Sequence, residues 1–152
     1  MTTKTEGRAV TGRPRSGLRR GADLAYGYLA AVFVLGVLVQ VYLAGVGVFG
    51  SNGRKVADAS SLDPHRMWGS VLMVLAIVLL ILALAAWQSA GTVLSTLLLA
   101  VLVTVAQTGL AAAGDSNKWL GGAHALDGMI ILLLSLWLAI AAWRRRSRSK
   151  ES

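Results

Sequence analysis

Long apolar stretches, broken by short polar segments, run through most of the chain. Between Met67 and Gly114, 48 consecutive residues contain no Asp, Glu, Lys or Arg. A helix crosses a hydrocarbon core with roughly 20 apolar residues, whereas a single helix over the whole stretch would extend ~70 Å at ~1.5 Å per residue. The stretch must therefore fold back once, and the polar, glycine-containing segment 88–91 predicts where it turns.

This hydrophobic pattern predicts four membrane-spanning segments. They cover about residues 25–49, 65–87, 92–113 and 121–143. In lipid every backbone polar group must be paired within its own segment, so each span is predicted to be a helix. Short connections favour an all-α, integral membrane four-helix bundle in up-down-up-down order, formed by residues 24–143.

Both ends of the chain are polar and basic. Residues 1–23 have little apolar surface to bury, so we expect a disordered basic tail, and residues 144–152 form a second basic tail. The pair Arg19-Arg20 ahead of an apolar stretch is compatible with a signal peptide. The apolar stretch 24–50 is longer than the ~7–15 residues of a signal's apolar region, which favours a retained span.

Positive charge is concentrated in these two tails. They hold eleven of the fifteen Lys and Arg, the two longer loops together with Arg66 hold four, and the 88–91 turn holds none. Because Lys and Arg accumulate on the cytoplasmic side, both termini of this multi-pass protein of the cell membrane are predicted to be cytoplasmic. The net charge of +8 then indicates contact with the anionic lipid of the bilayer and not with nucleic acid.

Composition excludes several kinds of chemistry. The chain has no Cys, so it holds no disulfide, iron–sulfur cluster or thiolate metal site. The predicted spans carry no Glu or Lys of the kind that a proton-coupled transporter would use. The sequence also shows no glycine-rich phosphate loop and no pairing of a nucleophile with a base.

A weak internal repeat relates the two halves of the chain. The first and third spans carry QVYLA from Gln40 and QTGLA from Gln107, and the second and fourth spans open with His-x-x-x-Gly at His65 and His124. Each half is therefore a glutamine-bearing helix followed by a helix that begins with histidine. Two such hairpins predict a bundle with pseudo-twofold symmetry whose halves run in the same direction.

The histidines His65 and His124 are predicted to lie at similar depth, at the outer ends of the second and fourth helices. These helices are diagonal neighbours, about 12–14 Å apart if adjacent helices pack ~8–10 Å apart. An iron bonded to both imidazoles at ~2 Å each would bridge the diagonal, and a b-type haem is the natural cofactor for such a site. The alternative is that both are ordinary polar residues at span ends.

Gly69 and Gly128 lie four residues past each histidine, on the same helix face and one turn deeper. A side chain there would collide with a flat macrocycle, so the glycines are candidate cofactor contacts, although small residues also serve close helix packing. Arg66 directly follows His65 and is a candidate ligand for a haem propionate, because Arg suits carboxylates. An ordinary arginine at the loop edge is the alternative.

Asp127 is the only acidic residue well within an apolar segment, where charged residues are usually functional. It could orient His124, or it could lie among wet lipid headgroups near the outer surface, and we favour the second interpretation. Gln40 and Gln107 are expected to form hydrogen bonds between helices.

With His65-Arg66, Gln107-x-x-Leu110 and His124 in view, residues 25–143 resemble one half of haem A synthase. The resemblance implies a four-helix bundle whose second and fourth helices open with histidines, and haem binding by His65 and His124. The chain is also similar to small uncharacterised actinobacterial four-helix membrane proteins with this layout.

The synthase activity is not implied by this resemblance. The synthase has two such halves and an acidic residue in its first outer loop, and some members have paired cysteines there. This chain has one half and no cysteine, and Asp58 and Asp63 are its only candidates for the loop acid.

Three functions remain open from the sequence. The first is a b-type cytochrome with two histidine ligands, which handles electrons or haem near the outer face together with a redox partner or membrane complex. The second is a non-enzymatic accessory or structural subunit whose histidines only pack. The third is a bundle that binds quinone or another small molecule without metal. A haem absorption band distinguishes the first from the other two.

Reporter fusions test the predicted topology. Fusions at Ser152 and after Gly21 should both show cytoplasmic behaviour, and a fusion within residues 51–60 should show external behaviour, because the excess of Lys and Arg lies in the tails. An external reporter at the C-terminus would contradict this orientation.

Overall fold

The computed structural model describes residues 17–50 and 59–148, and these residues contain no strand. The elements are α1 (Gly17–Phe49), the short 3₁₀ helix η1 (Ala59–Leu62), α2 (Asp63–Ala85), α3 (Ala90–Val101), the π-helical turn η2 (Leu102–Ala106), α4 (Gln107–Gly114) and α5 (Lys118–Arg148).

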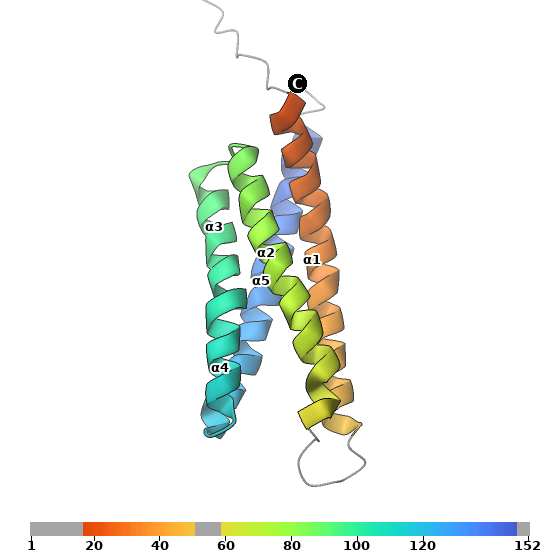
Figure 1. The fold of residues 1–152 in the computed structure, drawn as a ribbon. Helices are drawn as coiled ribbons and strands as arrows, with labels where there is room; N and C mark the ends of the chain where they lie inside the picture. The colour runs from red at the N-terminus through yellow and green to blue at the C-terminus, as the bar shows by residue number, and fades with distance from the viewer. Residues whose placement is uncertain (1–16, 51–58, 149–152) are drawn as a thin grey trace, which may run out of the picture.

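Four helices are long and apolar enough to cross a membrane: α1, α2, the continuous helix Ala90–Gly114 formed by α3, η2 and α4, and α5. They alternate in direction along the chain: in the view of Figure 1, α1 runs downward, α2 upward, the helix of α3 and α4 downward and α5 upward. This arrangement confirms the predicted fold class, and it is that of a small multi-pass membrane protein.

The helices are ordered as a ring. α1 packs against α2 and α5, α2 also packs against α3, and α4 packs against α5. Among the described elements, α2 and α5 make no close backbone contact, and neither do α1 and α3. The two histidine-bearing helices α2 and α5 are therefore diagonal neighbours, as predicted.

Helices α1 and α5 extend further than the predicted spans. α1 begins at Gly17 and α5 ends at Arg148, so residues 17–23 and 144–148 are helical. The predicted disorder of the tail 1–23 is therefore wrong for residues 17–23. Arginine favours this extension because its stem lies along apolar surface while the guanidinium reaches water. At the end of α5 the arginines also meet the negative end of the helix dipole. The rest of both predicted tails lies outside the described residues.

The turn between α2 and α3 closes with the hydrogen bonds of a Schellman motif. The amides of Trp87 and Gln88 donate to the carbonyls of Leu84 (2.9 Å) and Ala83 (3.1 Å), respectively. Trp87 has a φ of 50°, a left-handed conformation that glycine usually adopts. The hairpin predicted to turn at 88–91 is present, with its turn two residues earlier.

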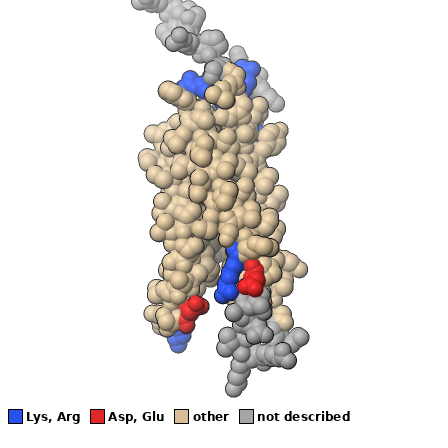
Figure 2. All heavy atoms as spheres, viewed as in Figure 1, with Lys and Arg blue, Asp and Glu red and all other residues tan. Residues whose placement is uncertain are grey.

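The two ends of the bundle differ in charge. At the basic end, where α1 begins and α5 ends, the described residues include one acid, Asp23, and six arginines: Arg19, Arg20, Arg144, Arg145, Arg146 and Arg148. The histidine end is the opposite one, where α2 and α5 begin. Figure 2 shows a broad band without charged side chains between these ends.

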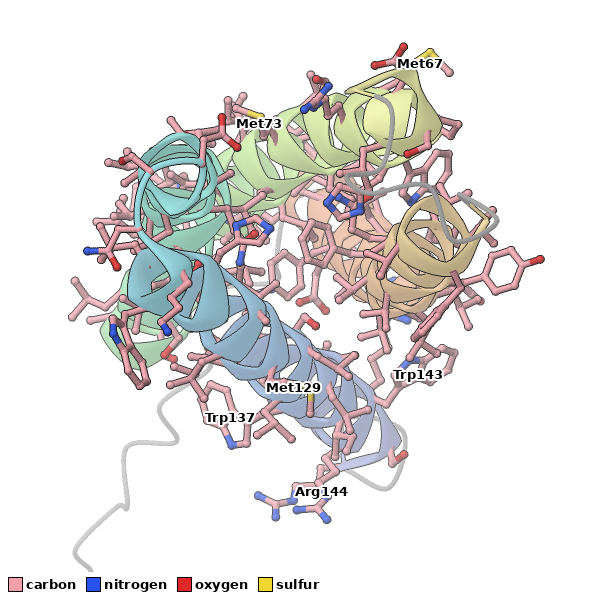
Figure 3. All side chains as sticks on the ribbon, turned by 90° about the horizontal axis from the view of Figure 1, so that it is seen from below. Met67, Met73, Met129, Trp137, Trp143 and Arg144 are labelled. Atoms are coloured by element: carbon pink, nitrogen blue, oxygen red, sulfur yellow. The ribbon has the colours of Figure 1, made fainter. Side chains whose placement is uncertain are left out.

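The core is mainly apolar but contains interhelical polar contacts. The largest fully buried side chains include Tyr26, Phe33, Leu79, Leu99 and Leu138. Thr96, also fully buried, donates from its hydroxyl to a carbonyl of its own helix, so the Tyr26 hydroxyl donates to Thr96 Oγ1 at 2.8 Å. Side chains such as Met67, Met129 and Trp137 point outward instead (Figure 3).

Tyr26→Phe should destabilise the bundle, because it removes the hydrogen bond to Thr96 and keeps the ring. We expect a loss of about 1 kcal/mol, within the range of about 0.6–1.7 for such bonds in membrane proteins. Thermal unfolding in detergent, followed by circular dichroism, should show a lower midpoint.

Tyr42→Phe is the matched control, because Tyr42 is 69% exposed and forms no hydrogen bond with a described residue. Equal midpoints for the two variants would show that the buried bond contributes nothing to stability.

Candidate functional site

The two histidines come together at the histidine end of the bundle. His65 lies in the first turn of α2 and His124 in the second turn of α5. Their ring centres are 6.3 Å apart, and the ring planes make an angle of 70°. Helices that make no close backbone contact therefore bring two imidazoles face to edge across the bundle.

Each ring is held in the same way by the glutamine of the preceding helix. His65 Nδ1 donates to the backbone carbonyl of Gln40, and His124 Nδ1 donates to that of Gln107, both at 3.1 Å. A carbonyl only accepts, so Nδ1 carries the hydrogen, and Nε2 is the basic nitrogen of each neutral ring. The internal repeat of the sequence thus corresponds to a repeated hydrogen bond.

The side chains of Gln40 and Gln107 form the interhelical hydrogen bonds expected of them, but with different partners. Gln40 Nε2 donates to His65 Nε2 at 3.2 Å. Gln107 Nε2 donates to the backbone carbonyl of His124 at 2.9 Å. As a result, both ring nitrogens of His65 have partners, whereas His124 Nε2 has none among the described residues.

The two glycines of the repeat lie against these glutamines. A Cβ at Gly69 would lie 3.1 Å from Gln40 Nε2, and a Cβ at Gly128 would lie 3.6 Å from Gln107 Nε2. The space predicted for a macrocycle is therefore used, at least in part, by the glutamine side chains. A side chain would therefore crowd Gln40 at Gly69, whereas a Cβ at Gly128 would be in ordinary van der Waals contact with Gln107.

Asp127 is buried inside the bundle, in contrast to the favoured prediction that it lies among wet lipid headgroups. Only 6% of its surface is exposed, because it shares the buried stripe of α5 with Ile131, Ser135 and Leu138. It does not orient His124 either, since that ring donates to the Gln107 carbonyl. The buried Oδ2 of Asp127 has no hydrogen-bond partner among the described residues, and the same is true of Gln40 Oε1.

Arg66 occupies an exposed position beside His65. Its guanidinium donates to Asp63 Oδ1 at 3.5 Å, one turn away on the same helix. Both side chains are more than half exposed, so this ion pair contributes little to stability. Arg66 therefore lies directly after His65 in an exposed position.

A cleft opens at the histidine end (Figure 2). In Figure 1, α4 and the start of α5 diverge here from α1 and the start of α2. α4 packs on α5 and makes no close backbone contact with α1 or α2 among the described elements. The two repeat-related helix pairs are thus separated on the side where the histidines approach each other.

The π-helical turn η2 directly precedes Gln107. The Gln107 amide donates to the Leu102 carbonyl, five residues back, which widens the helix at this point. The Thr104 hydroxyl also donates back, to the Ala100 carbonyl at 2.7 Å. Such widened turns occur frequently at functional sites. The sequence analysis missed this feature, and its only local signal is the pair of threonines, Thr104 and Thr108.

The donor set restricts the kind of metal that this end could hold. Within residues 17–50 and 59–148, no three His, Cys, Asp or Glu side chains cluster as a metal site. A bare ion would need more protein ligands than the two imidazoles. Two axial nitrogens are sufficient for a haem iron, because the porphyrin supplies the other four ligands.

Comparison with known proteins finds one family. The model of a family of unknown function, DUF6220, matches residues 40–114. The matched region begins at Gln40 and includes His65, Gly69 and Gln107, and it ends before His124. No curated protein and no solved structure matches the chain.

Proposed function

We propose that the bundle binds one b-type haem between His65 and His124 and serves in electron transfer or haem handling. The observation that carries this proposal is the pair of imidazoles. They come from diagonal helices, their centres are 6.3 Å apart, and each has its Nδ1 on a carbonyl.

The separation of the rings suits a shared iron. A metal lies about 2.0–2.1 Å from each imidazole nitrogen, and the ring centre is roughly 1.1 Å further back, so two opposed ligands have centres roughly 6 Å apart. The observed 6.3 Å agrees with this value. The rings meet face to edge at 70°, so one imidazole would have to turn before Nε2 of both rings faced a shared iron.

The hydrogen bonds to the glutamine carbonyls support the proposal as well. Histidines that ligate metals usually donate their other ring N–H to a carbonyl or carboxylate, which fixes the tautomer and the ring orientation. Nε2 of His65 and of His124 is thereby left as the coordinating atom.

Ligation also requires a change at Gln40. Gln40 Nε2, which donates to His65 Nε2, must release that atom to the iron. Gly69 and Gly128 would then border both the glutamine side chains and the porphyrin ring. Arg66 is the candidate partner of a haem propionate. The resemblance to one half of haem A synthase points to the same two histidines.

The proposed orientation places the haem toward the outer face. The six arginines at the basic end favour the cytoplasm for both termini of a protein in the cell membrane. A redox partner or membrane complex would then approach the cleft at the histidine end.

A cofactor-free accessory or structural subunit is the second candidate. It is favoured by His65, whose two ring nitrogens are both hydrogen-bonded to Gln40 without any metal. In this case the repeated Gln–His pairs serve only to join the helices.

Absorption spectroscopy of the purified protein separates the two candidates. Protein from haem-replete cells should be red, with the split visible bands of six-coordinate low-spin haem after reduction. His65→Ala and His124→Ala should each change these bands, because each removes one axial ligand, and the double variant should bind no haem. Asp115→Asn, an exposed change at the same end, is the control and should leave the spectrum intact. Colourless wild-type protein would exclude haem binding and favour the cofactor-free accessory subunit.

Gly69→Leu tests the space beside the haem. The side chain would displace Gln40 and fill the region one turn below His65, so haem retention should fall while membrane insertion is unchanged. Retention is measured as haem per protein after gel filtration. Gly122→Leu is the matched control, because nothing lies within 4 Å of a Cβ at Gly122. Equal haem retention by the two variants would show that the haem does not lie beside Gly69.

A further inference from the structure

A second polar site lies at the basic end of the bundle, away from the histidines. Here the turn between α2 and α3 faces the end of α5 and encloses a cavity of about 330 Å³. It is lined by Asp23, Ala86, Trp87, Gln88, Ser89, Arg145 and Arg148. A cavity with two arginines in its wall is suited to an anion.

Arg145 has unused hydrogen-bonding capacity in this wall. Its Nη1 donates to Thr92 Oγ1 at the long distance of 3.4 Å. Its Nη2 is buried and has no hydrogen-bond partner among the described residues. A buried donor without a partner is costly, and a guanidinium presents a planar fork that matches the oxygens of a phosphate.

The one carboxylate in the wall does not neutralise the arginines. Asp23 Oδ1 accepts a hydrogen bond from Gln88 Nε2 at 2.9 Å. Among the described residues Asp23 forms no ion pair with Arg145 or Arg148. The cavity therefore keeps an excess of positive charge.

The start of α3 adds to this positive potential. Ser89 caps the helix by accepting from the Thr92 amide, and the first turn contains no acidic residue. The partial positive charge of a helix N-terminus thus lies beside the two arginines. It supplements the guanidinium groups, which are the main anion-binding elements.

Aromatic side chains place the cavity at the depth of lipid headgroups. Trp87 lines it, and the Arg19 guanidinium lies 4.3 Å from the centre of that ring. Arg146 lies 5.2 Å from the rings of both Tyr28 and Trp143 at the same end. Tryptophan and tyrosine concentrate at the membrane–water interface, where the phosphates of phospholipids are also found.

We propose that this cavity binds the phosphate group of an anionic phospholipid, with Arg145 and Arg148 as its cationic ligands. The site is independent of haem binding, because it is built from other residues at the opposite end of the bundle.

Native mass spectrometry of the detergent-solubilised protein tests the proposal, with phosphatidylglycerol, phosphatidylcholine and inorganic phosphate as probes. The wild type should retain one phosphatidylglycerol in preference to phosphatidylcholine. Arg145→Gln should weaken this binding about tenfold, as expected for the loss of a charge-assisted hydrogen bond. Arg144→Gln is the matched control: it removes the same charge from the neighbouring position, but Arg144 points away from the bundle (Figure 3).

Two further variants distinguish a loss of lipid binding from a loss of folding. Arg145→Lys retains the charge and should bind several-fold more weakly than wild type, because lysine lacks the planar fork. Arg148→Gln alters an exposed side chain and should also reduce lipid retention. Equal losses for Arg144→Gln and Arg145→Gln would overturn the proposal in favour of diffuse attraction. Binding of inorganic phosphate without retained lipid would overturn the lipid assignment and indicate a site for free phosphate.

Discussion

The hydrogen bond from each histidine to a helix carbonyl is the contact around which the histidine end of the bundle is organised. The carbonyls of Gln40 and Gln107 belong to helices, and each also accepts from an imidazole of the next helix. In lipid no water competes for these groups, so such a bond determines the depth of one helix against the other. It holds α1 to α2 and α4 to α5 as two equivalent pairs. In the first pair, Gly69, one turn deeper, leaves room for the side chain of Gln40 to reach across to His65.

The two pairs are equivalent in backbone but not in the chemistry of their side chains. Gln40 turns toward the ring of His65, whereas Gln107 turns toward the backbone of its partner helix. Within residues 17–50 and 59–148, the π-helical turn occurs only before Gln107, and α5 alone carries an aspartate on its buried stripe. The symmetric contacts fix the positions of the histidines, and the asymmetric ones make the surroundings of the two rings different.

Features set by hydrophobic length and by the repeat were predictable from the sequence. The length of the charge-free stretch required the turn between α2 and α3, and the up-down-up-down order made His65 and His124 diagonal neighbours. Features that depend on the rotation of a helix were not predictable. Asp127 is three residues past His124, so its placement requires knowledge of which face of α5 is buried. The apolar residues of α5 lie on all sides of the helix, so its sequence does not indicate that face. The contact of Gly69 with Gln40 depends likewise on a rotamer on another helix.

Both candidate sites share a physical property, which is a buried polar atom that the described protein does not satisfy. At the histidine end these atoms include Gln40 Oε1 and Asp127 Oδ2, and at the basic end they include Arg145 Nη2. Each such group costs about 1–3 kcal/mol. A bundle that needed only to fold could replace them with apolar side chains at no loss, since lipid-facing and core surfaces are equally apolar. At the basic end, the anionic ligand that we propose would satisfy Arg145 Nη2, which is a donor. The two oxygens at the histidine end are acceptors, so they need a hydrogen-bond donor, which a haem iron does not supply.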